Sequence, residues 1–163
     1  NSIGDSVFAD YLVETMRNST LPKGMINFEI TETAVIRNID SAEELIASLR
    51  AMGCQFALDD FGSGLSSFGY LKKLSVDYLK IDGMFVKEIL NDEADRVFVQ
   101  AIISIAKAMG MKTVAEFVEN DEIYNLVESF GVDYAQGYGV HKPEKLNFYE
   151  SNVVPLSPNK KAV

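Results

Sequence analysis

Two neighbouring aspartates, Asp59 and Asp60, are the first candidates for chemistry in this sequence. They follow a short apolar run, Phe56-Ala57-Leu58, and precede a loop that contains Gly62 and Gly64. Adjacent residues of a strand point to opposite faces, so both carboxylates reach one site only where the strand ends and the backbone turns, as glycine permits. Two such carboxylates repel each other, and a divalent cation keeps both ionised. A solvent-exposed turn is the alternative interpretation.

Polar residues end each of five apolar runs of strand length. They are Glu29 and Glu32, Asp59 and Asp60, Lys80 and Asp82, Glu116 and Glu119, and Gln136 with Gly137. Because the loops after parallel strands gather at the carboxyl edge of a sheet or barrel, these groups are expected around one mouth. Carboxylate and amide oxygens suit Mg²⁺ or Mn²⁺, so the pattern predicts an oxygen-ligand metal site.

Lys80 lies between Leu79 and Ile81 in an apolar strand, and a buried lysine needs a carboxylate partner. Other candidates also fit structural roles. Glu29 and Glu32 could be exposed ends of an edge strand, and Asp82 could belong to a turn. His141 is expected on a surface loop, and without a second histidine a zinc site or a Ser-His-Asp triad has little support.

The composition of the 163 residues, with 47% hydrophobic and 24% charged residues, is typical of one globular domain. A formal net charge of −9 argues against a DNA or RNA polymer and against an anionic membrane surface as partners. No apolar run approaches the roughly 18 residues of a membrane span, and no signal peptide opens the chain. The single cysteine, Cys54, favours a reducing, cytoplasmic location and is expected to be buried before a strand.

The predicted elements alternate between helix and strand. Helices are expected over 5–18, from a capping box at Ser41 and Glu44 to Gly53, over 66–73, from Asp92 to Gly110, and from Ile123 to Gly131. Strands are expected near 25–30, 55–59, 77–81, 112–116 and 133–136. The recurring order of helix end, glycine and strand predicts an α/β fold of consecutive parallel βα units. Residues 150–163 are expected to form a poorly ordered tail.

The series FEITE, ALDDFGSG, LSVDYLKID, TVAEFVE and AQGY, in this order and spacing, closely resembles the EAL-domain family of cyclic di-GMP phosphodiesterases. The resemblance runs from about residue 5 to residue 146. It implies a modified TIM (β/α)8 barrel that hydrolyses one phosphodiester of cyclic di-GMP to linear pGpG with two Mg²⁺ or Mn²⁺ ions, inhibited by Ca²⁺. Residues 1–149 would supply strands four to eight of that barrel. A homodimer through the barrel and an upstream sensory or GGDEF domain are further implications.

The resemblance also assigns roles. It implies that Glu29, Asp59 and Asp60 are metal ligands and that Glu116 contacts the second ion or its water. It implies that Lys80 orients or activates the attacking water.

For the remaining positions, the resemblance makes Gln136, Glu119 and Asp82 substrate-side residues. Glu32, which we group with the catalytic residues, would anchor the DDFGSG loop.

Two departures from the family pattern matter. The Glu-Ala-Leu motif that names the family, and an asparagine on the next strand, are absent from this sequence, which predicts five strands where a barrel needs eight. The chain alone is therefore expected to be inactive, and a non-catalytic cyclic di-GMP receptor or partner-binding domain remains an alternative. Phe117 stands where the family commonly has glycine, and it could reshape the guanine-side wall.

Overall fold

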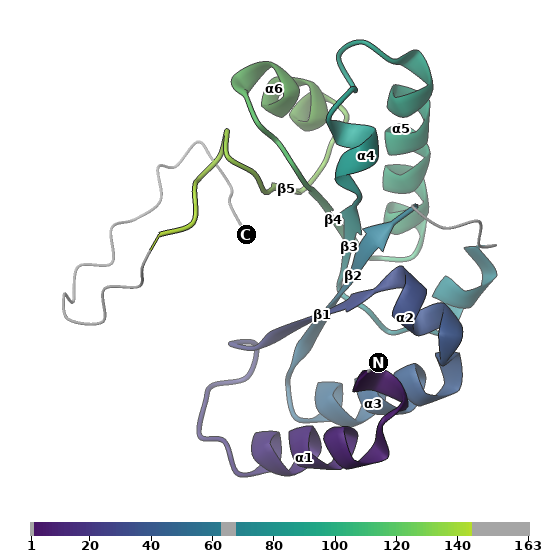
Figure 1. Ribbon diagram of the computed structural model, residues 1–163, viewed down its shortest axis with the longest axis vertical. Helices are drawn as coiled ribbons and strands as arrows, with labels where there is room; N and C mark the ends of the chain where they lie inside the picture. The colour runs from purple at the N-terminus through teal and green to yellow at the C-terminus, as the bar shows by residue number, and fades with distance from the viewer. Residues whose placement is uncertain (1, 63–67, 145–163) are drawn as a thin grey trace.

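The computed structural model describes residues 2–62 and 68–144, and its centre is one parallel sheet (Figure 1). Five strands lie in the order β1-β2-β3-β4-β5, and each pairs in parallel with its neighbour in sequence. They are β1 (Asn27–Thr31), β2 (Gln55–Phe61), β3 (Tyr78–Ile81), β4 (Lys112–Ala115) and β5 (Tyr134–Ala135). The predicted succession of parallel βα units is confirmed.

Helices precede the first strand and connect successive strands. They are η1 (Ser2–Gly4), α1 (Ser6–Arg17), α2 (Glu32–Arg37), α3 (Ile39–Ala51), the 3-10 helix η2 (Phe68–Lys72), α4 (Gly83–Val86), α5 (Glu93–Ala108) and α6 (Asp121–Ser129). Within the described residues, no helix is long and apolar enough to cross a membrane. The tail predicted over 150–163 and the first residues of the helix predicted over 66–73 lie outside the described part of the chain.

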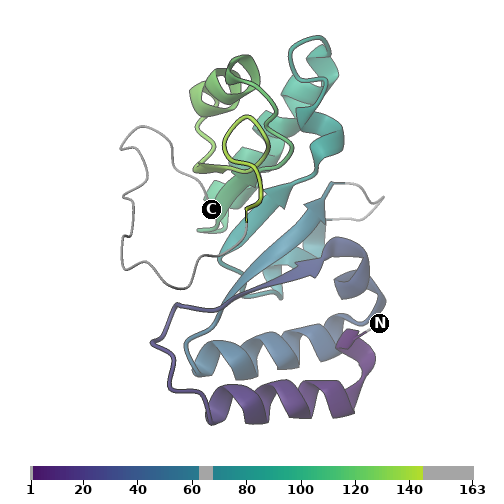
Figure 2. The same cartoon turned by 60° about the vertical axis from the view of Figure 1, so that its left-hand side comes forward.

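The two faces of the sheet differ in chemistry. Phe56, Leu58, Leu79 and Ile81 belong to the buried core into which α3 and α5 also pack apolar side chains. Figure 2 shows α1 beside α3 on the side away from the strands, which explains why α1 contributes no fully buried residue. Successive residues of a strand point to opposite faces, so the residues between these core positions lie on the other face of the sheet. Lys80, between Leu79 and Ile81, is one of them.

Two short α-helices, α2 and α4, were not predicted, and α2 corrects the position of Glu32. The first strand ends at Thr31, whose hydroxyl accepts a hydrogen bond from the Ala34 backbone N–H and so caps α2. Glu32 is therefore the first residue of α2 and not the end of a strand. The other unpredicted helix is α4, which follows β3 directly.

The predicted capping box at Ser41 is wrong. A single residue, Asn38, joins α2 to α3, and its carbonyl already accepts a hydrogen bond from the Ala42 N–H. The helix is therefore under way at Ile39, and Ser41 lies inside its first turn. Cys54 is buried just before β2, as predicted.

The second strand also continues further than predicted, and an irregularity in it replaces the expected strand end. Leu58 pairs with Leu79 and Phe61 pairs with Ile81, so β2 has one residue more than β3 over this stretch. Such a bulge bends the strand locally. Asp60 has a left-handed φ of 54°, and Gly62 follows with φ 98°. The bulge therefore places the two aspartates at the carboxyl edge of the sheet.

Candidate metal centre

The carboxyl edge of the sheet is organised around Lys80 of β3. Its ammonium nitrogen lies 2.8 Å from Asp59 Oδ1, 2.8 Å from Glu116 Oε1 and 3.2 Å from Glu29 Oε2. The Lys80 side chain is only 5% exposed, whereas that of Glu29 is 51% exposed. Three carboxylates, from β1, from β2 and from the residue after β4, thus contact one lysine on β3. They come together because parallel strands end at the same edge of the sheet.

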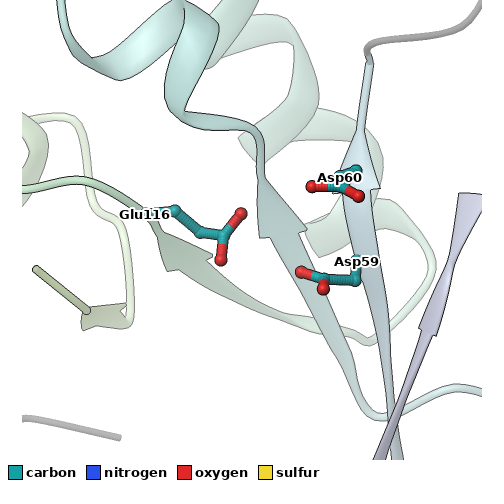
Figure 3. A group of neighbouring side chains, drawn as sticks. All are labelled: Asp59, Asp60 and Glu116. Atoms are coloured by element: carbon teal, nitrogen blue, oxygen red, sulfur yellow. The ribbon is translucent and has the colours of Figure 1, made fainter. Parts of the chain in front are cut away.

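Asp60 adds a fourth carboxylate. Figure 3 shows Asp59 and Asp60 on β2 with Glu116 facing them from the end of β4. One oxygen from each of the three carboxylates lies within 4.8 Å of the other two. Asp59 Oδ1, although close to Lys80, is buried without a hydrogen bond of good geometry to any residue that the structure describes. A carboxylate oxygen has two lone pairs, so Asp59 Oδ1 can contact Lys80 and still bind a cation, and this donor set fits a hard divalent ion.

The electrostatics of the cluster follow from its burial. Burial, then the charges of Asp59 and Asp82, raise the pKa of Asp60 above its usual value. Burial also raises the pKa of Glu116, although its hydrogen bond and charge interaction with Lys80 partly oppose this. For Lys80, burial lowers the pKa, but the hydrogen bonds with Asp59 and Glu116 outweigh burial, and the pKa rises. Lys80 therefore stays cationic, and the carboxylates retain an unfavourable excess of negative charge that a cation would relieve.

Glu32 is buried and holds the chain that follows the two aspartates. Its Oε2 accepts a hydrogen bond from the Gly62 backbone N–H at 3.0 Å, and its Oε1 accepts one from the Tyr70 hydroxyl at 2.8 Å. Burial, followed by the hydrogen bond and charge of Glu32, raises the pKa of Tyr70. Sequence reasoning did not identify Tyr70, because an aromatic residue in a predicted short helix carries no sign of a partner 38 positions away.

The three residues expected on the substrate side fall into two places. Gln136 and Glu119 line a pocket of about 320 Å³ together with Glu116 and Phe117. The Asp82 carboxylate instead accepts a hydrogen bond from the Met84 N–H and caps α4, as a structural interpretation of this residue expects.

His141 does not join the cluster. Its Nε2 lies 2.6 Å from Glu144 Oε1 in an exposed pair.

Parallel βα units with an oxygen-donor cluster at the carboxyl ends of the strands define an α/β-barrel type of protein with a candidate divalent-cation site. The family model for the EAL domain matches residues 1–143. The chain belongs to the EAL domain family.

Relatives and solved structures agree with this assignment. The chain is 44% identical over 149 residues to the cyclic di-GMP phosphodiesterase PdeB of Shewanella oneidensis, and it is 40% identical over 145 residues to the cyclic di-GMP phosphodiesterase PdeA of Borreliella burgdorferi. These matches cover 91% and 89% of the chain but only 17% and 22% of the two relatives. The chain thus spans about a fifth of their length.

Among solved structures, the EAL domain of FimX from Pseudomonas aeruginosa bound to c-di-GMP matches with a TM-score of 0.80 at 28% identity, over 88% of this chain and 59% of that one. A manganese and cyclic di-GMP complex of BlrP1 from Klebsiella pneumoniae matches with a TM-score of 0.76 at 27% identity, over 86% of this chain and 36% of that one. The five-stranded sheet accordingly corresponds to part of an EAL barrel.

Proposed function

We propose that this chain forms the C-terminal part of an EAL domain that hydrolyses one phosphodiester bond of cyclic di-GMP to linear pGpG, using Mg²⁺ or Mn²⁺. The observation that carries the proposal is the contact of the buried Lys80 ammonium with the carboxylates of Asp59, Glu116 and Glu29 at one edge of the sheet. The names of the relatives support the substrate, because PdeB and PdeA are both cyclic di-GMP phosphodiesterases.

The metal ligands in this proposal are Glu29, Asp59 and Asp60, with Glu116 at the second ion or its water. The buried Asp59 Oδ1 and the mutual approach of the Asp59, Asp60 and Glu116 oxygens support this assignment. When bound, the ions would neutralise the anionic phosphodiester and lower the pKa of water. Without such ions, an acidic edge would repel the substrate.

In this proposal, the remaining residues bind the substrate and orient the attacking water and the metal ligands. Lys80 keeps its proton in this environment, so it acts by donating hydrogen bonds that fix Asp59 and Glu116 and, in turn, orient the attacking water. Gln136 and Glu119 line the adjoining pocket, where an amide and a carboxylate can hydrogen-bond to substrate or water. Glu32 holds the Gly62 backbone, which keeps Asp59 and Asp60 in position. The Asp82 carboxylate caps α4 by accepting a hydrogen bond from the Met84 N–H, and we propose that it also faces the substrate side.

Binding without hydrolysis is the alternative, in which the domain is a cyclic di-GMP receptor or partner-binding domain. The Glu-Ala-Leu motif does not occur in this sequence, and its glutamate is expected to complete the metal shell. A receptor would keep the affinity for cyclic di-GMP and lose only turnover.

The setting of the domain is also part of the proposal. We expect a cytoplasmic domain, a homodimer formed through the barrel, and a sensory or GGDEF domain upstream. Size-exclusion chromatography with light scattering would test the dimer directly.

The decisive experiment measures activity after the missing strands of the barrel have been supplied. The whole chain is produced after the segment of PdeB that directly precedes the region matched by this chain, a fusion that we call the completed domain, and is compared with the chain alone. We expect Mg²⁺- or Mn²⁺-dependent conversion of cyclic di-GMP to pGpG by the completed domain, inhibition by Ca²⁺, and no turnover by the chain alone. Binding without turnover would support the receptor, and absence of binding with any of these ions would refute the proposed function.

A further inference from the structure

Tyr70 connects the short helix η2 to the buried carboxylate that holds the end of β2. Its ring is partly buried against the hydrophobic core. Its hydroxyl donates a hydrogen bond to Glu32 Oε1 at 2.8 Å, across 38 positions of the sequence. Glu32 is only 2% exposed. The core therefore holds the ring, and the ring brings the hydroxyl to a carboxylate that water does not reach.

The two oxygens of Glu32 each accept a hydrogen bond from an uncharged donor. Oε1 accepts from the Tyr70 hydroxyl, and Oε2 accepts from the Gly62 backbone N–H at 3.0 Å. Because burial removes the carboxylate from water, each donor offsets part of the cost of its desolvation. Rotation of the carboxylate group would move both oxygens together. The hydroxyl at Oε1 therefore fixes the direction in which Oε2 faces Gly62.

Gly62 lies two residues after Asp60, a proposed metal ligand. Asp60 has a left-handed φ of 54°, which persists only where the surrounding structure enforces it. A Cβ atom at Gly62 would lie 2.8 Å from Phe85 Cε2, so the backbone at this position already approaches a buried ring closely. The contact with Glu32 and the contact with Phe85 together restrain the turn that brings the Asp60 carboxylate near that of Asp59.

We propose that Tyr70 is a positioning residue for the metal centre, and that its hydroxyl orients the Glu32 carboxylate. The oriented carboxylate holds the Gly62 backbone, and the turn before Gly62 keeps Asp60 within reach of the ion that Asp59 also binds. This role rests on the proposed function, because it takes both aspartates as metal ligands. A tyrosine that only filled space would need its ring and not its hydroxyl.

Tyr70→Phe in the completed domain removes the hydroxyl and keeps the ring. We expect the dissociation constant of Mg²⁺, measured by calorimetry without substrate, to rise about tenfold, the lower end of the loss that follows removal of a group supporting a metal ligand. The Mg²⁺ concentration that gives half-maximal turnover should rise by the same factor. Saturating Mg²⁺ should restore turnover, and KM for cyclic di-GMP should then equal that of the unsubstituted domain.

Two control variants separate positioning from a loss of stability. Tyr134→Phe also removes a tyrosine hydroxyl from a hydrogen bond, one that Lys112 donates at 3.0 Å from the first residue of β4, whereas the metal centre lies at the carboxyl ends of the strands. Ile46→Val, at a buried position of α3, should lower the melting temperature through the loss of one methylene group. Both controls should leave the Mg²⁺ affinity unchanged.

A double substitution tests the route from the hydroxyl to the ion. If Tyr70 acts through the Glu32 carboxylate, Tyr70→Phe should weaken Mg²⁺ binding in the unsubstituted domain and add no further loss in a Glu32→Ala domain. If the double variant does not fold, the Mg²⁺ affinity of Tyr70→Phe alone decides the question.

The outcomes distinguish this role from the proposed function. If the unsubstituted completed domain binds no Mg²⁺, both fail. If it binds Mg²⁺ without turnover and Tyr70→Phe weakens that binding, the receptor alternative holds and the positioning role stands. If it hydrolyses cyclic di-GMP and Tyr70→Phe keeps its Mg²⁺ affinity, or loses only melting temperature, the positioning role is overturned while the proposed function stands. A further loss of Mg²⁺ affinity in the Glu32→Ala domain would also overturn it, because the hydroxyl would then act by another route.

Discussion

Lys80 has two interpretations that make different predictions. As a scaffold residue it neutralises Asp59 and Glu116, and breaking a buried ion pair typically costs 3–5 kcal/mol. As a functional residue it orients water, and part of its interaction energy appears only in the transition state. The geometry allows both roles, because the ammonium group that neutralises the buried carboxylates also contacts the proposed metal ligands.

We expect Lys80→Met in the completed domain to fold and to bind cyclic di-GMP with Ca²⁺, yet to lose at least about a hundredfold in turnover with Mg²⁺. Melting temperature, Ca²⁺-supported binding and turnover are measured on one preparation. A variant that melts early but turns over normally per folded molecule would assign Lys80 to the scaffold alone.

Asp59 contributes a buried oxygen, Oδ1, that lies 2.8 Å from the Lys80 ammonium and close to the Asp60 and Glu116 carboxylates. Asp59→Asn in the completed domain should lower turnover with Mg²⁺ by more than about a hundredfold, because a neutral amide is a weaker ligand for a hard cation. Mg²⁺ titration by calorimetry and turnover are measured together. The control is Asp10→Asn, at an exposed position of α1, which should change neither quantity. Unchanged Mg²⁺ affinity in Asp59→Asn would exclude Asp59 as a ligand.

The shape of the end of β2, and its contact with α2, decide whether both aspartates can serve one site. The bulge in β2 and the left-handed φ of Asp60 turn a regular strand into a pair of convergent carboxylates. The Glu32 carboxylate of α2 then fixes Gly62 just beyond the bulge. The precision of the metal centre therefore depends on a buried hydrogen bond between two elements.

Glu32→Ala should reduce the free energy of unfolding by about 1–3 kcal/mol, since the Gly62 N–H and the Tyr70 hydroxyl lose their acceptor. Urea unfolding of the chain measures this change. Glu32→Gln is the matched control, because its amide oxygen can still accept from Gly62 while its amide N–H donates to the Tyr70 oxygen. A Glu32→Ala chain as stable as the unsubstituted one would show that the stability of the fold does not depend on these two hydrogen bonds.

Within the described residues, β1 and β5 are the two edges of the sheet, and the acidic cluster extends from β1 to the residue after β4, around Lys80 on the central strand β3. Four carboxylates around one ammonium group destabilise the folded chain through their mutual repulsion. A ligand that binds only the folded state stabilises it by mass action. The stability of the molecule should therefore depend on divalent cations.

Addition of Mg²⁺ at 100 times its dissociation constant should raise the free energy of unfolding by about 2.7 kcal/mol, and EDTA should remove this gain. Urea unfolding with and without Mg²⁺ gives the difference. In Asp60→Asn the gain should shrink, while in Asp10→Asn it should persist. An equal gain in Asp60→Asn would indicate that the ion binds elsewhere.

The sequence by itself determined the class of fold and the family. Apolar runs, glycines and helical periodicity are local signals, and they were enough to predict parallel βα units and to identify polar residues such as Lys80 and Glu116 at the strand ends. The order of short motifs was sufficient for the resemblance to the EAL domain, which the family comparison confirms.

Only the tertiary structure decided how these residues meet. The bulge in β2, the helical position of Glu32 and the strained φ of Phe117 depend on neighbours that lie far away in the sequence. Tyr70, for example, is 38 residues from the carboxylate that it contacts. The physical reason is that periodicity reports which face a residue occupies, whereas distances across strand ends are set by register and packing of the whole sheet, to which every strand contributes.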